Sequence, residues 1–136
     1  QERCHAEVKK KLYGYGLNKT ETELLISYLI EENYLNEERY AIAYAGGKFR
    51  MKYWGKIKIS YELKMNGVSE YCIKKAIATI EDKEYEKMLT KLAVAKWKTL
   101  SSEKDSFTKK GKLYNYLTGK GYESVLFEKI LKEMLV

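Results

Sequence analysis

Proline, cysteine and histidine are scarce in this 136-residue chain, and each shortage limits what the protein can be. The sequence has no proline, whereas average usage of about 5% would give several. A β-sandwich or an α/β chain would normally use proline at its turns, so we expect an all-α protein. Two cysteines, Cys4 and Cys72, are too few for a disulfide framework, and we expect reduced thiols. No further Cys, His or Asp completes a zinc-binding set with the single histidine, His5, so we expect a surface histidine and no metal site.

Signals for membrane insertion, secretion and catalysis are missing as well. No stretch reaches the roughly 18 apolar residues that a membrane helix requires, and nothing resembles a signal peptide. We therefore expect a cytoplasmic protein. The segment Gly46-Gly47-Lys48 lacks the upstream glycine of a phosphate-binding loop, because residue 42 is Ile. The acidic clusters lie where they would cap or cover helices, so we expect no catalytic residue, no cofactor and no enzymatic activity.

One phrase occurs three times, and it is the most informative feature that the sequence does contain. An apolar residue, Leu, Gly and a second apolar residue follow one another at spacings of four, four and one: Val8-Leu12-Gly16-Leu17, Ile59-Leu63-Gly67-Val68 and Leu113-Leu117-Gly121-Tyr122. Residues four apart share one helix face, and glycine just past the last turn supplies a left-handed stop that is often accompanied by an apolar contact. Three copies at a nearly constant period indicate a helical repeat.

Apolar side chains recur at helical spacing along the chain, for example at Leu24, Leu25, Tyr28 and Leu29. We expect about eight helices, at residues 2–15, 20–33, 36–52, 55–66, 69–80, 83–100, 106–118 and 123–136. Thr20 and Glu23 are the expected capping box of the second helix, and Asn36 is the expected cap of the third. Grouped by the glycine phrase, the helices form three-helix units at residues 1–53, 54–104 and 105–136, of which the last is incomplete.

Positive charge is concentrated in two stretches. Residues 46–75 carry eight Lys and Arg against two Glu, and residues 96–121 carry seven Lys against one Glu and one Asp, whereas residues 18–45 have a net charge of −4. Basic blocks on a repeat scaffold indicate binding to nucleic acid or to an acidic protein surface. The alternative is that the lysines simply cover solvated helix faces. The candidate binding residues of the first stretch are Lys48, Arg50, Lys52, Trp54, Lys56, Lys58 and Lys64.

The 13 tyrosines raise the further possibility of base stacking, since aromatic rings beside cations bind single strands. Four of them fall at helical spacing and are expected in the core: Tyr28, Tyr40, Tyr44 and Tyr61. Tyr53 and Trp54 lie inside the basic block, and for these two residues both core packing and base stacking remain open.

Four segments resemble the RecX family of bacterial regulators of the RecA recombinase. Residues 33–41, Asn-Tyr-Leu-Asn-Glu-Glu-Arg-Tyr-Ala, resemble the family's Gly-Tyr-Leu-Asp-Asp-Glu-Arg-Phe-Ala. Residues 54–59, Trp-Gly-Lys-Ile-Lys-Ile, are similar to its Trp-Gly-Pro-Arg-Arg-Ile, and residues 61–68 to its Gln-Glu-Leu-Arg-x-Lys-Gly-Ile. Residues 116–122 resemble its Leu-x-Arg-Arg-Gly-Phe. Asn33 stands in place of the family's Gly, Lys56 in place of Pro and Ile57 in place of an Arg.

The resemblance implies tandem three-helix repeats in a curved, elongated molecule that docks in the groove of a RecA–DNA filament and restrains its activity. We also expect a monomeric chain that acts by binding. Two other functions remain open from the residues alone. The chain could bind single- or double-stranded DNA directly, with its lysines neutralising phosphates, or it could be a scaffold for an unrelated acidic partner.

Overall fold

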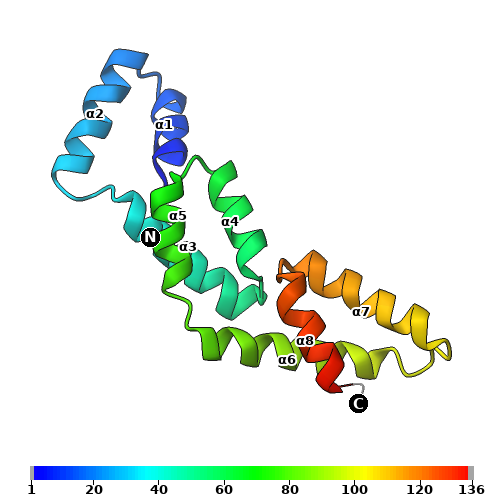
Figure 1. Ribbon diagram of the computed structural model, residues 1–136. Coiled ribbons are helices and arrows are strands. Elements are labelled where there is room, and N and C mark those ends of the chain that lie inside the picture. The colour runs from blue at the N-terminus through cyan, green and yellow to red at the C-terminus, as the bar shows by residue number, and fades with distance from the viewer. Residues whose placement is uncertain (1, 135–136) are drawn as a thin grey trace. The chain divides into compact units, whose positions relative to one another are not determined.

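The computed structural model describes residues 2–134, and these form eight α-helices with no strand (Figure 1). The helices are α1 His5–Gly14, α2 Lys19–Glu31, α3 Glu37–Gly47, α4 Lys56–Met65, α5 Glu70–Ala78, α6 Asp82–Thr99, α7 Ser106–Lys120 and α8 Ser124–Met134. A π-helical turn, Lys48–Lys52, follows α3. The predicted all-α class is confirmed. The curved shape and the three repeat units at 1–53, 54–104 and 105–136 stay predictions.

The three repeated glycines end their helices in the left-handed conformation. Their φ angles are 88° at Gly16, 81° at Gly67 and 94° at Gly121. In each case the N–H of the following residue donates to the carbonyl of the phrase's Leu, at 3.4 Å for Leu12, 3.1 Å for Leu63 and 3.2 Å for Leu117. This is the backbone bond of a Schellman stop, so the positive φ expected at the three glycines is confirmed.

Two helix ends differ from the sequence-based expectation. The capping box of α2 is formed by Asn18 and Glu21, whose side chains accept from each other's backbone N–H, so the capping box expected at Thr20 and Glu23 is wrong. Asn is as good a cap as Thr or better, and it lies earlier in the chain. The third helix, expected to reach Lys52, changes to the π-helical turn after Gly47. The cap at Asn36 is confirmed, because its Oδ1 accepts from the N–H of Arg39 at 2.9 Å.

Only some of the tyrosines that were expected in the core are buried. Tyr40 is buried and Tyr44 is half-buried, but Tyr28 and Tyr61 are more than half exposed. Helical spacing places apolar residues on one face, but it does not provide an element that covers that face. His5 is half-buried rather than on the surface, and its Nε2 is enclosed without a hydrogen-bond partner.

The chain forms two compact units, each discontinuous in sequence. Unit 1 contains Gln1–Gly47 and Ser60–Thr79. In it α1 packs on α2, and α3 packs on α5. Its core side chains are Leu35, Tyr40, Ala41, Ala45, Leu63, Val68, Cys72, Ile73 and Ala76. Cys4 and Cys72 are both free and buried, and burial raises the pKa of each thiol.

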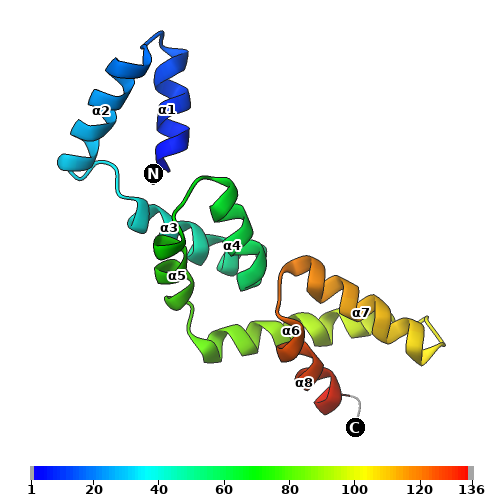
Figure 2. The same cartoon turned by 45° about the horizontal axis from the view of Figure 1, so that its top comes forward.

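Unit 2 contains Lys48–Ile59 and Ile80–Val136. The long helix α6 is its base, and α7 and α8 pack on α6 and on each other (Figures 1 and 2). The core side chains are Phe49, Ile59, Tyr85, Leu89, Ala93, Leu113, Leu117, Tyr122 and Phe127. The basic residues from Lys48 to Lys58 therefore belong to the same unit as the second basic stretch, residues 96–121. Across the described residues, no helix is long and apolar enough to cross a membrane.

Candidate binding surface

The segment from Lys48 to Lys58, which we call the basic segment, contains five Lys and Arg and no acidic residue. It begins as the π-helical turn and ends in the first turn of α4. Between them Tyr53 has a φ of 61°, a left-handed conformation that costs a non-glycine residue roughly 1–2 kcal/mol. The N–H of Tyr53 donates to Phe49 O at 3.1 Å, and its carbonyl accepts from the Tyr122 hydroxyl at 3.0 Å. These bonds hold the bend in place.

The basic segment is attached end to end to the C-terminus of α7. The N–H of Gly55 donates to Lys120 O at 2.7 Å, and the N–H of Ile57 donates to Gly121 O at 2.9 Å. The last carbonyls of one helix thus accept from the first amides of another, which satisfies groups that neither helix can satisfy internally. The opposite ends of the two helix dipoles also meet there. We call this contact the α4–α7 junction.

The junction requires glycine at two positions. A β-carbon on Gly55 would lie 2.6 Å from the Tyr122 backbone nitrogen and still closer to the Gly121 carbonyl. A β-carbon on Gly121 would lie 2.6 Å from the Lys58 backbone nitrogen and still closer to its Cβ. Gly121 therefore does more than stop α7, because it also lets the two backbones approach each other. Gly55 of the Trp54-Gly55 pair is likewise required by the close approach of the two backbones.

The buried side chain of Tyr85 supports the basic segment through a hydrogen bond. Its hydroxyl accepts from the Lys56 backbone N–H at 2.9 Å and donates to the Glu123 carboxylate. Its ring packs against Tyr122, with a centroid distance of 5.0 Å, and against Phe49 at 5.9 Å. Burial, reinforced by the hydrogen bond to Glu123, raises the pKa of Tyr85 far above its ordinary value. The site therefore rests on a neutral tyrosine buried among aromatic rings.

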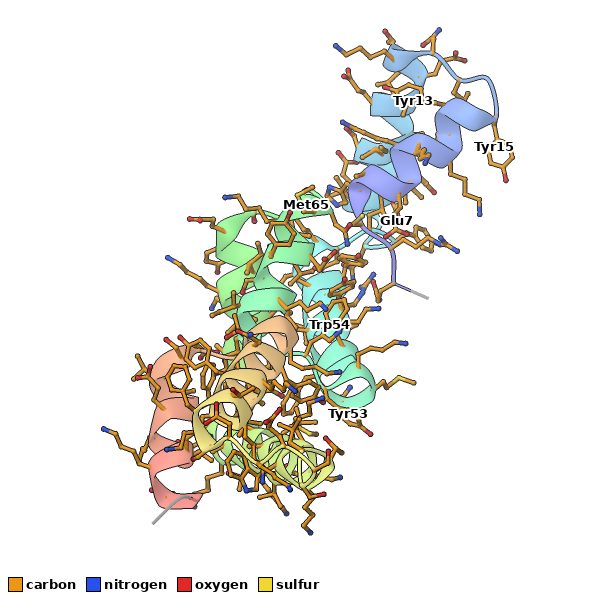
Figure 3. All side chains as sticks on the ribbon, turned by 90° about the vertical axis from the view of Figure 1, so that its right-hand side faces the viewer. Glu7, Tyr13, Tyr15, Tyr53, Trp54 and Met65 are labelled. Carbon is orange, nitrogen blue, oxygen red and sulfur yellow. The ribbon has the colours of Figure 1, made fainter. Side chains whose placement is uncertain are left out.

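Trp54 organises two of the cations. The ammonium groups of Lys48 and Lys58 lie over its ring, 5.0 and 4.7 Å from the centroid. Such cation–π contacts hold a long side chain in place while its charge remains near the surface. Figure 3 labels Trp54 and Tyr53 on this segment. Lys120 also reaches the segment, where its Nζ donates to Lys52 O at 3.2 Å.

The remaining candidate cations are in different environments. Arg50 and Lys52 are exposed, and no acidic side chain of the described residues pairs with either. Lys56 is the least exposed, since its Nζ lies 3.6 Å from Asp82 Oδ1 and 4.5 Å from the centre of the Tyr85 ring. It serves the structure of unit 2 and is a poor choice for a reversal meant to leave the fold intact. Lys64 belongs to unit 1, where it lines an open groove with Tyr61.

The second basic stretch repeats the pairing of cations with aromatic rings. Lys109 lies 3.9 Å from the centre of the Trp97 ring, and Lys96 lies 5.0 Å from that of Tyr116. The sequence indicated binding for this stretch as a whole but named no individual residue of it, because the pairs join α6 to α7 across a sequence distance that spacing does not reveal. The concentration of lysines in residues 96–121 was the available signal, and it does not identify the aromatic partner of each lysine.

The net charge is divided unequally between the two units. Unit 2 carries 17 Lys and Arg against nine Asp and Glu, a net charge of +8. Unit 1 carries nine against ten, a net charge of −1. The chain's net charge of +7 is thus located entirely on unit 2, which makes unit 2 the candidate surface for an anionic partner.

The segment 33–41 is explained by folding within unit 1. Asn33 has a φ of 60°, and Asn is the residue that tolerates this conformation best after glycine. The Arg39 guanidinium donates to the carbonyls of Asn33 at 3.1 Å and Tyr34 at 3.4 Å, and it forms an ion pair with Glu2. Leu35 is buried. These contacts fix the loop that connects α2 to α3.

Known proteins resemble this chain in sequence along most of its length. Residues 36–77, which contain α3, α4 and all but the last residue of α5, match the family model described as "RecX, second three-helix domain". That unit begins at α3, whereas the glycine-based division begins its second unit at α4. The regulatory protein RecX of Clostridium perfringens strain 13 is 33% identical over 118 residues, which are 86% of this chain and 55% of that protein. The regulatory protein RecX of Clostridium botulinum strain Eklund 17B is 29% identical over 130 residues, 95% of this chain and 60% of that protein.

Solved structures show the same fold. A crystal structure of regulatory protein RecX superposes with a TM-score of 0.89 at 21% identity, covering 97% of this chain and 64% of the other. RecX from Lactobacillus salivarius superposes with a TM-score of 0.88 at 23% identity, covering 100% and 88%. The chain spans a little over half the length of the curated relatives that it matches. From the family model, the relatives and the shared fold, the chain belongs to the RecX family.

Proposed function

We propose that this chain is a non-enzymatic regulator that binds RecA–DNA filaments and restrains recombinase activity. Family membership supports a regulatory role, since its relatives are named regulatory proteins. The observation that carries the proposal is the net charge of +8 on the unit that presents the basic segment. A filament of protein on DNA offers both phosphates and acidic side chains to such a surface.

The mechanism is mass action on filament states. A chain that binds one state of the filament more tightly than another shifts the population toward that state, by no more than the difference in affinity. The α4–α7 junction and the Trp54 ring fix Lys48 and Lys58 before any partner arrives. Little side-chain entropy is then lost on binding, which favours affinity.

The direct test follows the single-strand-dependent ATPase and the strand exchange of the cognate RecA with increasing amounts of the chain. Both rates should fall in proportion to filament occupancy, while the chain alone hydrolyses no nucleotide and cuts no DNA. Unchanged rates at a saturating concentration of the chain would refute the proposal. Hydrolysis of nucleotide or cleavage of DNA by the chain alone would show that it is an enzyme.

Direct binding to nucleic acid is the second candidate function, and the pairing of lysines with aromatic rings favours it. Trp54, Trp97 and Tyr116 each lie under at least one ammonium group, an arrangement that suits phosphates beside bases. Fluorescence anisotropy of a labelled oligonucleotide, with the chain alone, separates the candidates. Phosphate binding predicts a steep linear fall of log affinity with log salt, with a slope of about 0.9 per phosphate neutralised on B-DNA. Contact with a protein surface predicts a weaker dependence.

A set of charge reversals tests the basic segment itself. Arg50→Glu, Lys52→Glu and Lys58→Glu together should weaken filament binding by at least about tenfold. The far-UV circular dichroism should not change, because Arg50 and Lys52 are exposed and contribute little to stability, and the half-buried Lys58 loses a cation–π contact with Trp54 that is worth only about 0.5–1 kcal/mol. Lys129→Glu and Lys132→Glu, on α8 outside both basic stretches, form the matched control. Equal binding by the triple variant and the parent would show that the docking surface is elsewhere.

A further inference from the structure

One face of α2 is apolar but uncovered. Within α2 only Thr22 and Ile26 are buried, and they form the narrow stripe of a helix that packs on one side. On another face Leu24 is 68% exposed, Tyr28 is 53% exposed and Leu25 is 37% exposed. Leu24 and Tyr28 are four residues apart and therefore lie next to each other on the helix surface. We call these three side chains the α2 apolar stripe.

Acidic residues border the α2 apolar stripe, and the one cation of α2 is Lys19, the first residue of the helix and five positions before Leu24. Glu21 precedes Leu24 by three residues, and Glu31 and Glu32 follow Tyr28 by three and four, so all three lie toward the same face. Residues 20–38 contain six Glu and no Lys or Arg. The stripe is thus apolar in the middle and negative at both ends.

We propose that the α2 apolar stripe is a second docking surface, and that it binds an apolar cleft bordered by Lys or Arg on a protein partner. The inference rests on the proposed function, in which that partner is a protomer of the recombinase filament. Exposed Leu and Tyr side chains gain by burial in an apolar cleft, and the flanking carboxylates select cations at its ends. Tyr28 is an amphipathic anchor of the kind enriched at binding hot spots.

The chemistry of the stripe excludes the partners that suit unit 2. A nucleic-acid backbone is repelled by the glutamates, because its affinity for proteins comes from cations that displace counterions. An anionic membrane surface is disfavoured for the same reason, since interfacial helices carry Lys and Arg on their polar face. Unit 1, with its net charge of −1, therefore suits the protein component of a filament, and unit 2, with +8, suits its anionic component.

The helix that carries the stripe is firmly held. The Asn18–Glu21 capping box fixes its first turn. The opposite face contains the buried Ile26, and α2 packs on α1. Tyr13 and Tyr15 at the end of α1 are also exposed, and Figure 3 shows both at that end of the helix. The stripe is therefore presented by a helix that is capped at its first turn and packed along one face, which suits recognition by a partner of complementary shape.

The test compares two exposed pairs in the full chain. Leu24→Ser with Tyr28→Ser removes the stripe, and Met65→Ser with Val125→Ser removes two side chains that are 66% and 76% exposed and lie outside the basic segment and the second basic stretch. Binding of fluorescently labelled chain to preformed filaments should fall roughly 10- to 100-fold for the first pair. It should change by less than about twofold for the control pair. Both variants should bind a labelled oligonucleotide as the parent does.

A charge variant provides an independent measurement. Glu31→Lys with Glu32→Lys should weaken filament binding but strengthen oligonucleotide binding, because it removes negative charge from a chain that carries a net positive charge. If the Leu24 and Tyr28 variant binds filaments as well as the parent, the docking surface is overturned and the proposed function stands. If the parent itself does not bind filaments, the proposed function fails, and the assignment of the stripe to a filament protomer fails with it. Sedimentation showing a parent dimer that the variant abolishes would also overturn the proposal, since a second copy would then cover the stripe.

Discussion

The α4–α7 junction leads to a prediction whose size can be worked from the structure. Replacing Gly55 with Ala places a methyl group 2.6 Å from the Tyr122 nitrogen, and the neighbouring atoms are backbone atoms that cannot rotate away. Overpacking of this kind costs roughly 1–3 kcal/mol. Moving the chains apart also weakens the bonds from Gly55 to Lys120 O and from Ile57 to Gly121 O, each worth about 1 kcal/mol. We expect Gly55→Ala to lower the free energy of unfolding by about 3 kcal/mol.

Two other glycines distinguish the cost of overpacking at Gly55 from the other effects of adding a methyl group. Gly67 has a positive φ but open space around its Cα, so Gly67→Ala should cost only the left-handed strain, about 1–2 kcal/mol. Gly111 lies inside α7 with nothing near it, so Gly111→Ala should stabilise the chain by roughly 0.5–1 kcal/mol. These variants are matched in chemistry, because each adds the same methyl group.

Urea unfolding followed by circular dichroism and by tryptophan fluorescence measures these effects. Both tryptophans, Trp54 and Trp97, belong to unit 2, so fluorescence reports on the unit that contains Gly55. Gly55→Ala should shift the fluorescence transition, whereas Gly67→Ala should act mainly on the dichroism, because Gly67 belongs to unit 1. Equal costs for the two variants, or no cost for Gly55→Ala, would refute the close approach of the backbones at the junction.

Three further predictions concern single side chains. The pKa of Tyr85 is raised in the folded protein, so its protonated form stabilises the fold below pH about 10, and this stability is lost as the pH rises further. Tyr85→Phe should therefore flatten the decline of stability with pH in a series of thermal melts. An unchanged slope would contradict this prediction. Arg39→Lys keeps the charge but loses the planar fork in which Nη2 donates to the Asn33 and Tyr34 carbonyls while Nε donates to Glu2, so it should cost about 1–2 kcal/mol in urea unfolding, and a neutral result would argue against these contacts. Asn33→Ala should cost about 1 kcal/mol, whereas Asn33→Gly should be nearly neutral, and the reverse order would contradict the left-handed conformation.

The sequence was most informative where the governing contacts are local. Helix positions and the three left-handed stops depend on residues within five positions of one another, and spacing alone identified Gly16, Gly67 and Gly121. The capping box of α2 was misplaced by two residues, because two overlapping pairs of similar quality compete there. Burial was harder to predict, since Tyr28 and Tyr61 have core spacing but no covering element.

The contacts that build the candidate surface were out of reach because they join distant parts of the chain. Nothing in the segment Trp54-Gly55 indicates that its glycine meets Gly121, 66 positions later. The division of charge was hidden for a similar reason, since each unit is discontinuous in sequence. A window of residues 46–75 mixes the cations of both units, so it included Lys64 with residues that belong to unit 2.

The junction explains why two of the segments that resemble the RecX family occur together. Residues 54–59 and residues 116–122 are the two sides of the α4–α7 junction, where Gly55 and Gly121 permit the backbones to approach. The same junction holds Trp54, which positions Lys48 and Lys58. Backbone atoms make the junction, whereas side chains present the charge. A change from Arg to Lys in these segments therefore alters the geometry of contact with a partner and leaves the element that presents the cations unchanged.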